Sequence, residues 1–176
     1  AQSVVTHDTA AGTPGPDGKP YGTWGCATIR VIAPDFSARN LTIENAFDYL
    51  AHLRAPVFEQ IGSNGAQAVA LMTQGDKIQL ENVHLLGHQD TLYVRAALGD
   101  AGDRVYVRHS LVAGDVDFIF GAGTLVIDDS TILSRAGRRA PGEGGHVLAP
   151  STAAQTRLGM LVINSRWISE AGLRPG

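Results

Sequence analysis

Apolar and polar residues alternate in short runs along most of this chain, beginning near residue 27. A period of two is typical of β-strands, because successive side chains of a strand point to opposite faces. We therefore predict strands within residues 27–33, 38–45, 67–73, 76–87, 90–94, 103–114, 117–121, 123–134, 146–151 and 157–169. Residues 1–25, rich in Gly, Pro, Thr and Asp, are expected to form an exposed loop, and residues 46–65 an insertion loop or short helix.

Polar residues interrupt the longer runs near their middle, at Asn40, Asn82, His109, Asp129 and Asn164. The steps between these positions range from 20 to 42 residues, so any repeat is loose and interrupted by insertions. Short strands with polar residues at their bends, and no helical period, predict a solenoid in which stacked strands supply one core. The whole chain, residues 1–176, is then one all-β domain, with ordinary hairpins or a sandwich as alternatives.

Two stretches, Lys77–Val94 and Arg104–Gly121, repeat the same pattern: an apolar run, a Gly, and an Asp three residues later. The pairs are Gly87 with Asp90 and Gly114 with Asp117. If each stretch is one rung of the solenoid, the two carboxylates lie about 4.8 Å apart, the spacing of neighbouring strands. Two carboxylates that close favour protonation of one of them, which separates an acid from a nucleophile. The pattern therefore indicates an enzyme acting on esters or glycosides.

Composition excludes several other classes. The chain has 176 residues, a net charge of −3 and no basic stripe, so we expect no nucleic-acid partner. No apolar run approaches the ~20 residues of a membrane span. The single cysteine, Cys26, excludes an internal disulfide and is expected to be a small buried residue. His84 and His88 are four residues apart, but in a strand this spacing does not make a metal site, and we predict no metal.

Three segments, QAVAL (67–71), GHQDTLY (87–93) and GDVDFIFG (114–121), resemble the central signatures of the pectin methylesterases, carbohydrate esterase family 8, of the bacterial type. The resemblance runs from about Ala27 to Trp167 and covers the middle of a family member. It implies a right-handed parallel β-helix that removes methyl groups from the galacturonate units of pectin and releases methanol, without cofactor or metal. It also implies a secreted, periplasmic or outer-membrane-associated protein, whose signal peptide would lie outside this chain, and we expect a monomer.

The resemblance also assigns roles. Asp117 would be the nucleophile that attacks the ester carbonyl, and Asp90 the general acid and then the general base. The side chains of Gln67 and Gln89 would stabilise the oxyanion. Two aromatic residues, Tyr93 and Phe118, are candidates to line a groove for the sugar chain.

One family motif, LGRPW, is absent from this chain. In the family its Arg binds the nucleophilic Asp, whereas Arg166 and Trp167 lie here in a strand-like run. We therefore expect a fragment, incomplete at both ends of the solenoid, that is weak or inactive alone.

Three alternatives remain open. The first is a thioesterase-like relative in the same family, which an assay with acyl-CoA against methylated pectin would separate. The second is a glycoside hydrolase on the same fold, but an inverting pair stands about 6.5–9.5 Å apart, too far for adjacent rungs. The third is a non-catalytic β-helical carbohydrate-binding or structural module, which would tolerate any residue at positions 90 and 117.

Overall fold

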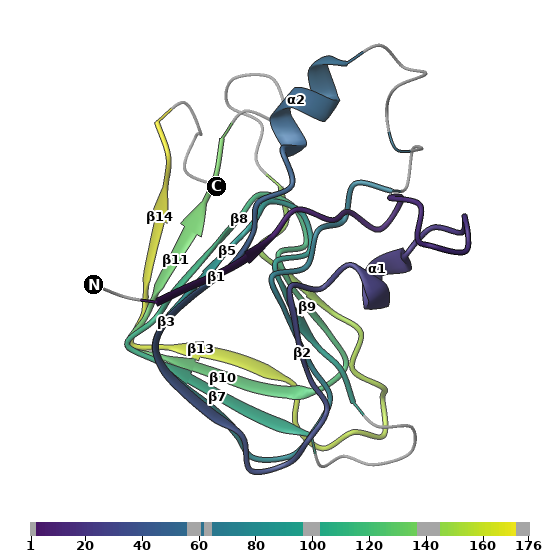
Figure 1. The fold of residues 1–176 in the computed structure, drawn as a ribbon. Helices are drawn as coiled ribbons and strands as arrows, with labels where there is room; N and C mark the ends of the chain where they lie inside the picture. The colour runs from purple at the N-terminus through teal and green to yellow at the C-terminus, as the bar shows by residue number, and fades with distance from the viewer. Residues whose placement is uncertain (1–2, 56–60, 62–64, 97–102, 137–144, 172–176) are drawn as a thin grey trace.

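The computed structural model describes residues 3–55, 61, 65–96, 103–136 and 145–171, which form a parallel β-helix (Figure 1). The chain winds repeatedly through similar turns, and each strand pairs in parallel with strands of neighbouring turns. The strands are β1 (Ser3–His7), β2 (Ile29–Val31), β3 (Ser37–Asn45), β4 (Leu71–Thr73), β5 (Ile78–Leu86), β6 (Leu92–Val94), β7 (Arg104–Arg108), β8 (Leu111–Gly114), β9 (Ile119–Gly121), β10 (Thr124–Asp128), β11 (Thr131–Ser134), β12 (Leu148–Pro150), β13 (Met160–Ile163) and β14 (Arg166–Ser169).

These strands form two sheets. The smaller one has five strands in the order β12-β9-β6-β4-β2. The larger one has nine strands and contains a bend. Strands β3 and β5 run through this bend. In the other turns the bend separates two strands, as in the pairs β7 and β8, β10 and β11, and β13 and β14. Figure 1 shows the resulting outline, with the five-stranded sheet opposite the bend.

The core fills the inside of the helix with stacked aliphatic side chains. Along the five-stranded sheet, paired positions carry Ile29, Leu71, Leu92, Ile119 and Leu148 in succession. The three central members of this row are fully buried. No single rung can bury its apolar face, so stacking rungs about 4.8 Å apart creates the core.

The two stretches that repeat in the sequence are neighbouring rungs. Ile78 pairs with Val105 and Leu92 pairs with Ile119, in each case 27 residues later. The register predicted from the Gly and Asp positions is therefore confirmed.

The polar positions inside the long runs mark the bend. Asn40, Asn82, His109, Asp129 and Asn164 all have a left-handed backbone, with φ between 42° and 56°. Asn and Asp tolerate this conformation better than other residues with a side chain, because their short polar groups hydrogen-bond locally. The prediction that these residues lie at bends is confirmed.

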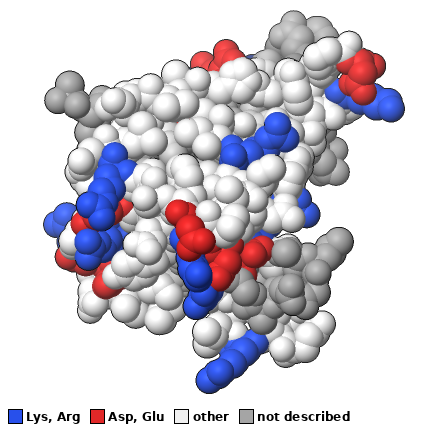
Figure 2. Space-filling view, turned by 60° about the horizontal axis from the view of Figure 1, so that its bottom comes forward, with Lys and Arg blue, Asp and Glu red and all other residues white. Residues whose placement is uncertain are grey.

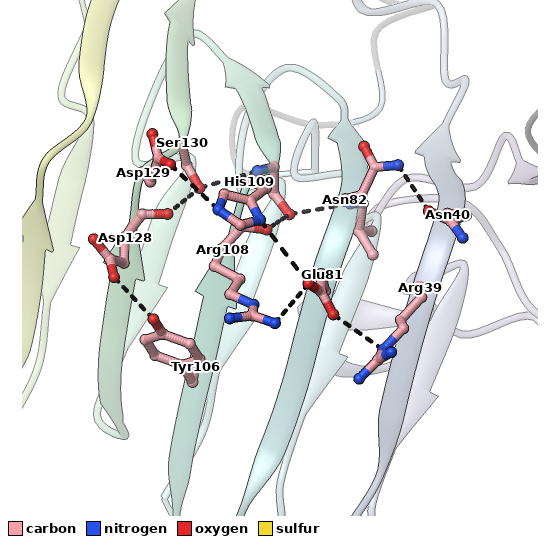
Figure 3. A network of polar contacts seen from close by, with 12 residues as sticks. Arg39, Asn40, Glu81, Asn82, Tyr106, Arg108, His109, Asp128, Asp129 and Ser130 are labelled. Atoms are coloured by element: carbon pink, nitrogen blue, oxygen red, sulfur yellow. Dashed lines mark hydrogen bonds and ion pairs between the residues drawn. The ribbon is translucent and has the colours of Figure 1, made fainter.

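Outward-facing polar groups connect the rungs near the bend (Figure 3). Asn82 Nδ2 donates a hydrogen bond of 2.7 Å to Asn40 Oδ1 on the preceding rung. The Glu81 carboxylate lies between two arginines, 3.1 Å from Arg39 and 2.6 Å from Arg108. Because such exposed pairs contribute little free energy each, we assign the stability of the helix to its core.

The N-terminal segment differs from the expected exposed loop. Residues Ser3–His7 form strand β1, which pairs with β3, and Ala10 and Ala11 are buried. All five residues of β1 are exposed. The strand has no buried face, so its sequence does not show the alternation of apolar and polar residues from which strands are predicted. A short helix, α1 (Gly22–Gly25), ends this segment.

The segment 46–65 contains a second helix, α2 (Tyr49–Arg54). Its first turn is capped by Asp48, whose Oδ1 accepts a hydrogen bond of 2.9 Å from the Ala51 amide. Residues 56–60 and 62–64 of the segment lie outside the described residues.

The face of the molecule in Figure 2 carries Lys and Arg side chains beside Asp and Glu, without a continuous basic strip. Among the described helices, neither is long and apolar enough to span a lipid bilayer.

Candidate active site

The two aspartates of the repeated pattern lie on neighbouring rungs, directly before β6 and β9. Gln89 and Val116, the residues that precede Asp90 and Asp117, form a parallel bridge. The Asp90 amide donates to the Val116 carbonyl at 3.1 Å. Both aspartates have a left-handed backbone, with φ of 68° and 49°. The fold thus presents two carboxyl groups at the same point of consecutive turns, as the sequence predicted.

The environments of the two carboxyl groups differ. Asp90 is almost buried, with 7% of its surface exposed, whereas the Asp117 side chain is 40% exposed. Asp117 Oδ1 also lies 3.8 Å from Nδ1 of His146, which is on the next rung. Burial disfavours the charged form of a carboxyl group. The buried Asp90 therefore suits an acid and the exposed Asp117 suits a nucleophile.

Cys26 lies near Asp90. Its thiol is fully buried and faces the carbonyls of Thr23 and Gln67, with sulfur–oxygen distances of 3.5 and 3.6 Å. Burial raises the pKa of this thiol, while a backbone hydrogen bond with Val69 opposes the shift. A protonated thiol is a poor nucleophile, so the expectation of a small buried residue is confirmed.

The two glutamines are both half-buried. Gln89 directly precedes Asp90, and its carbonyl accepts a hydrogen bond of 3.1 Å from the Ala68 amide, next to Gln67. The carbonyl of Gln67 accepts from the Ala11 amide at 2.8 Å. Its side-chain Oε1 is buried and has no hydrogen-bond partner among the described residues. Gln89 therefore lies on the rung of Asp90, and Gln67 lies on the rung before it.

A buried acid–histidine pair joins the two turns and was not predicted from the sequence. Asp115 Oδ2 lies 3.7 Å from His88 Nδ1, and their side chains are only 3% and 12% exposed. The Asp115 amide also donates to the His88 carbonyl at 3.0 Å. The ring of Tyr49 stacks on His88 with centroids 5.3 Å apart. Because Asp115 and His88 each precede one of the aspartates by two residues, this pair fixes one turn against the other.

Of the two aromatic residues expected to line a groove, Tyr93 is partly exposed and Phe118 is not. Phe118 is fully buried in the core and has no surface to offer a sugar, so we no longer assign it to a groove. The strand alternation does not continue through the left-handed Asp117, and Phe118 consequently points inward. Tyr93 instead stacks on Phe120 of the next rung, with ring centroids 4.2 Å apart and planes at 15°. Both of these rings are half-buried on the outside of the five-stranded sheet.

In the described part of the chain, no cluster of three or more His, Cys, Asp or Glu side chains is arranged to hold a metal ion.

Comparison with known proteins identifies the family. The family model described as pectinesterase matches residues 9–174. Pectinesterase A of Dickeya chrysanthemi is 38% identical over 177 residues, covering 98% of this chain and 47% of the relative. A pectinesterase of Ralstonia nicotianae is 43% identical over 139 residues, covering 79% of this chain and 33% of the relative.

Solved structures agree with this assignment. Pectin methylesterase from Yersinia enterocolitica superposes with a TM-score of 0.90 at 38% identity, covering 98% of this chain and 53% of that one. A pectin methylesterase in complex with a hexasaccharide superposes with a TM-score of 0.87 at 38% identity, covering 96% and 49%. The chain spans about half the length of these structures and of the Dickeya relative. It belongs to the pectinesterase family.

Proposed function

We propose that the protein hydrolyses the methyl esters of galacturonate units in pectin and releases methanol. The observation that carries this proposal is the placement of Asp90 and Asp117 at the same point of neighbouring rungs, one nearly buried and one exposed. The family match favours ester chemistry over the glycoside hydrolase and binding-module alternatives. The neighbour bound to a hexasaccharide supports a sugar-chain substrate.

In the first step, a carboxylate oxygen of Asp117 attacks the carbonyl carbon of the methyl ester. The carbonyl oxygen becomes an oxyanion, which the side-chain amides of Gln67 and Gln89 stabilise by donating hydrogen bonds. When the carbon–oxygen bond to the methoxy group breaks, Asp90 donates its proton and methanol leaves. The product is an acyl–enzyme anhydride on Asp117, and Asp90 is left ionised.

In the second step, Asp90 removes a proton from a water molecule, which attacks the acyl carbon of the anhydride. The bond to Asp117 breaks and releases a free galacturonate carboxyl group. Asp117 returns to a carboxylate and Asp90 is again protonated, so the cycle closes without a cofactor. Dividing the reaction into two steps replaces one difficult displacement by two easier ones.

The experiment is methanol release from highly methylated pectin by the polypeptide in which this chain naturally occurs, compared with its Asp117→Asn and Asp90→Asn variants. Asn keeps the left-handed backbone that these positions need, so the variants test chemistry rather than folding. Asp129→Asn is the matched control, because Asp129 is an exposed bend residue and Asn occupies the corresponding bend at Asn40, Asn82 and Asn164.

We expect loss of at least about 100-fold in kcat for the two site variants, in line with removal of a nucleophile or general acid, and no change for the control. Methanol release that survives in Asp117→Asn would refute the assigned nucleophile. A folded wild-type protein that releases no methanol would refute the function itself.

The proposed substrate also bears on location and assembly. Pectin lies outside cells, so we propose that the protein acts in the periplasm, at the outer membrane or in the medium. The expected monomer stays a prediction, which sedimentation can test.

A further inference from the structure

The buried pair of His88 and Asp115 has the same register as the two aspartates of the site. Asp115 follows His88 by 27 residues, and Asp117 follows Asp90 by the same step, which is the step between these two rungs. His88 Nδ1 lies 3.7 Å from Asp115 Oδ2. An acid–base pair thus spans the gap between the two rungs, two residues before the carboxyl groups of the site span it.

The link between the two pairs is short and made of backbone. One residue separates His88 from Asp90, and one residue separates Asp115 from Asp117. The two turns also contact each other along this link. The Asp115 amide donates to the His88 carbonyl at 3.0 Å, and the Asp90 amide donates to the Val116 carbonyl at 3.1 Å. Because a single intervening residue has only two soft dihedral angles, a shift of the first pair moves the second.

The surroundings hold the acid–base pair in place. The side chains of His88 and Asp115 are only 12% and 3% exposed. The ring of Tyr49, in α2, stacks on the imidazole with the two planes at 18°. The next rung lies against Asp115, since a Cβ atom at Gly145 would overlap the Asp115 carbonyl oxygen. The pair is therefore packed by a helix and by a further rung, and any effect on the reaction passes through its neighbours in the chain.

The two carboxyl groups of the site need a force that opposes their repulsion. Two carboxylates on neighbouring rungs repel each other whenever both are ionised, and this repulsion pushes the two turns apart. His88 and Asp115 attract each other whenever the imidazole is protonated. Because this attraction acts across the same gap, it opposes the repulsion from a position two residues away.

We propose that His88 and Asp115 are positioning residues, which hold the carboxyl groups of Asp90 and Asp117 at the separation that both steps of the reaction require. The roles of the two aspartates rest on the proposed function. His88 and Asp115 do not touch the substrate in this scheme, and they act through the backbone of the two turns. Catalysis is sensitive to such positioning, because a displacement of about 1 Å can cost about 100-fold in rate.

The test is methanol release from highly methylated pectin, with kcat and KM determined separately, by the polypeptide in which this chain naturally occurs. Asp115→Asn removes the charge with almost no change of volume. His88→Phe keeps a ring against Tyr49 but removes both nitrogens. His88→Arg restores a cation on a planar group that can stack on Tyr49. The double variant of Asp115→Asn and His88→Phe measures whether the two residues act as a unit.

Glu81→Gln is the matched control. The Glu81 carboxylate pairs with Arg108 at 2.6 Å, so it joins the same two rungs at the same step of 27 residues (Figure 3). This pair lies beside the bend of the larger sheet, next to Asn82, and not at the turns that carry the aspartates. Urea unfolding of every variant shows whether it is folded under the assay conditions.

We expect kcat to fall about tenfold in Asp115→Asn and in His88→Phe, while KM stays within about twofold. The substrate contacts are unchanged in these variants, and only the alignment of the reacting groups is lost. The double variant should fall no further than the weaker of the two single variants. His88→Arg should recover most of the loss, and Glu81→Gln should behave as the wild type.

Three results would overturn the positioning role: folded single variants with the kcat of the wild type, a rise in KM without a fall in kcat, or losses that add in the double variant. A loss in Glu81→Gln as large as that in Asp115→Asn would show that the pair is only a structural link between rungs. If His88→Phe does not fold, the comparison of Asp115→Asn with Glu81→Gln decides. Wild-type protein that releases no methanol would refute the proposed function and the positioning role together, whereas an active wild type with unaffected variants would refute the positioning role alone.

Discussion

Asn45 offers the sharpest test of how the N-terminal segment is attached to the rungs. Its side chain is 3% exposed and makes four hydrogen bonds. The two N–H groups of Nδ2 are shared among the carbonyls of Thr9, Cys26 and Val69, at 2.9, 3.1 and 3.1 Å. Oδ1 accepts from the Phe47 amide at 3.1 Å. One amide group thus connects four segments, including the one that carries Trp24.

The perturbation is Asn45→Asp, which keeps size and shape but replaces both donors by an acceptor. The carbonyls of Thr9 and Cys26 lose this donor, and a carboxylate faces them instead. The Val69 carbonyl also loses it but keeps its hydrogen bond of 3.0 Å from the Thr28 amide. At about 1–3 kcal/mol for each buried group left unsatisfied, and with some relaxation, the free energy of unfolding should fall by about 3–5 kcal/mol at neutral pH. Part of this loss should be recovered as the pH falls towards about 4, because a protonated carboxyl regains one donor.

The assay is urea unfolding followed by tryptophan fluorescence and circular dichroism, with the change taken from the midpoint at constant slope. Asn82→Asp is the matched control, because the same substitution falls on an exposed bend residue and should cost less than about 1 kcal/mol. If Asn45→Asp proves as stable as Asn82→Asp, the four hydrogen bonds do not hold the segment in place.

Further predictions follow from the core and from the titratable groups. Phe118→Ala should lower the free energy of unfolding by about 3–5 kcal/mol, because the ring is fully buried, and calorimetry or urea unfolding would measure the loss. Cys26, the only cysteine, should react with a thiol reagent at pH 8 only when the protein unfolds, because burial raises the pKa of its thiol; rapid labelling of the native protein would contradict this. Asp76 accepts two hydrogen bonds from the Arg104 guanidinium group, which holds the pKa of that carboxyl well below its usual range. Arg104→Gln should raise the pKa of Asp76 towards its ordinary value in a titration followed by NMR, and no change would show that the pair does not persist in solution.

The sequence predicted those parts of the structure that repeat. The left-handed bends at Asn82 and His109 and the equivalent positions of Asp90 and Asp117 were visible because each rung copies the next. When two rungs have the same pattern, the equivalent positions show which residues pair between them. A slip of one residue in this pairing would turn every apolar side chain of the strand outward.

Contacts that do not recur from rung to rung could not be predicted from the sequence. Trp24 meets Arg95 across 71 residues, from a segment without periodicity, and nothing in local sequence pairs them. His88 and Asp115 form a buried pair only because the rungs place them together, and neither residue type signals burial. The inward direction of Phe118 depends on the backbone of the preceding Asp117, which alternation alone does not report.

The aspartates of the site show why residue type alone could not identify them. Asp35, Asp129, Asp90 and Asp117 all have a left-handed backbone, and at such positions Asp is favoured for conformational reasons whether or not it takes part in chemistry. What distinguishes the last two is where the fold places them. Asp35 and Asp129 are exposed beside Lys77 and His109, whereas Asp90 and Asp117 precede consecutive strands of the five-stranded sheet and differ in burial. Asp is thus favoured both by a left-handed backbone and by carboxylate chemistry. Only the alignment of neighbouring rungs distinguishes the aspartates of the site from those at bends.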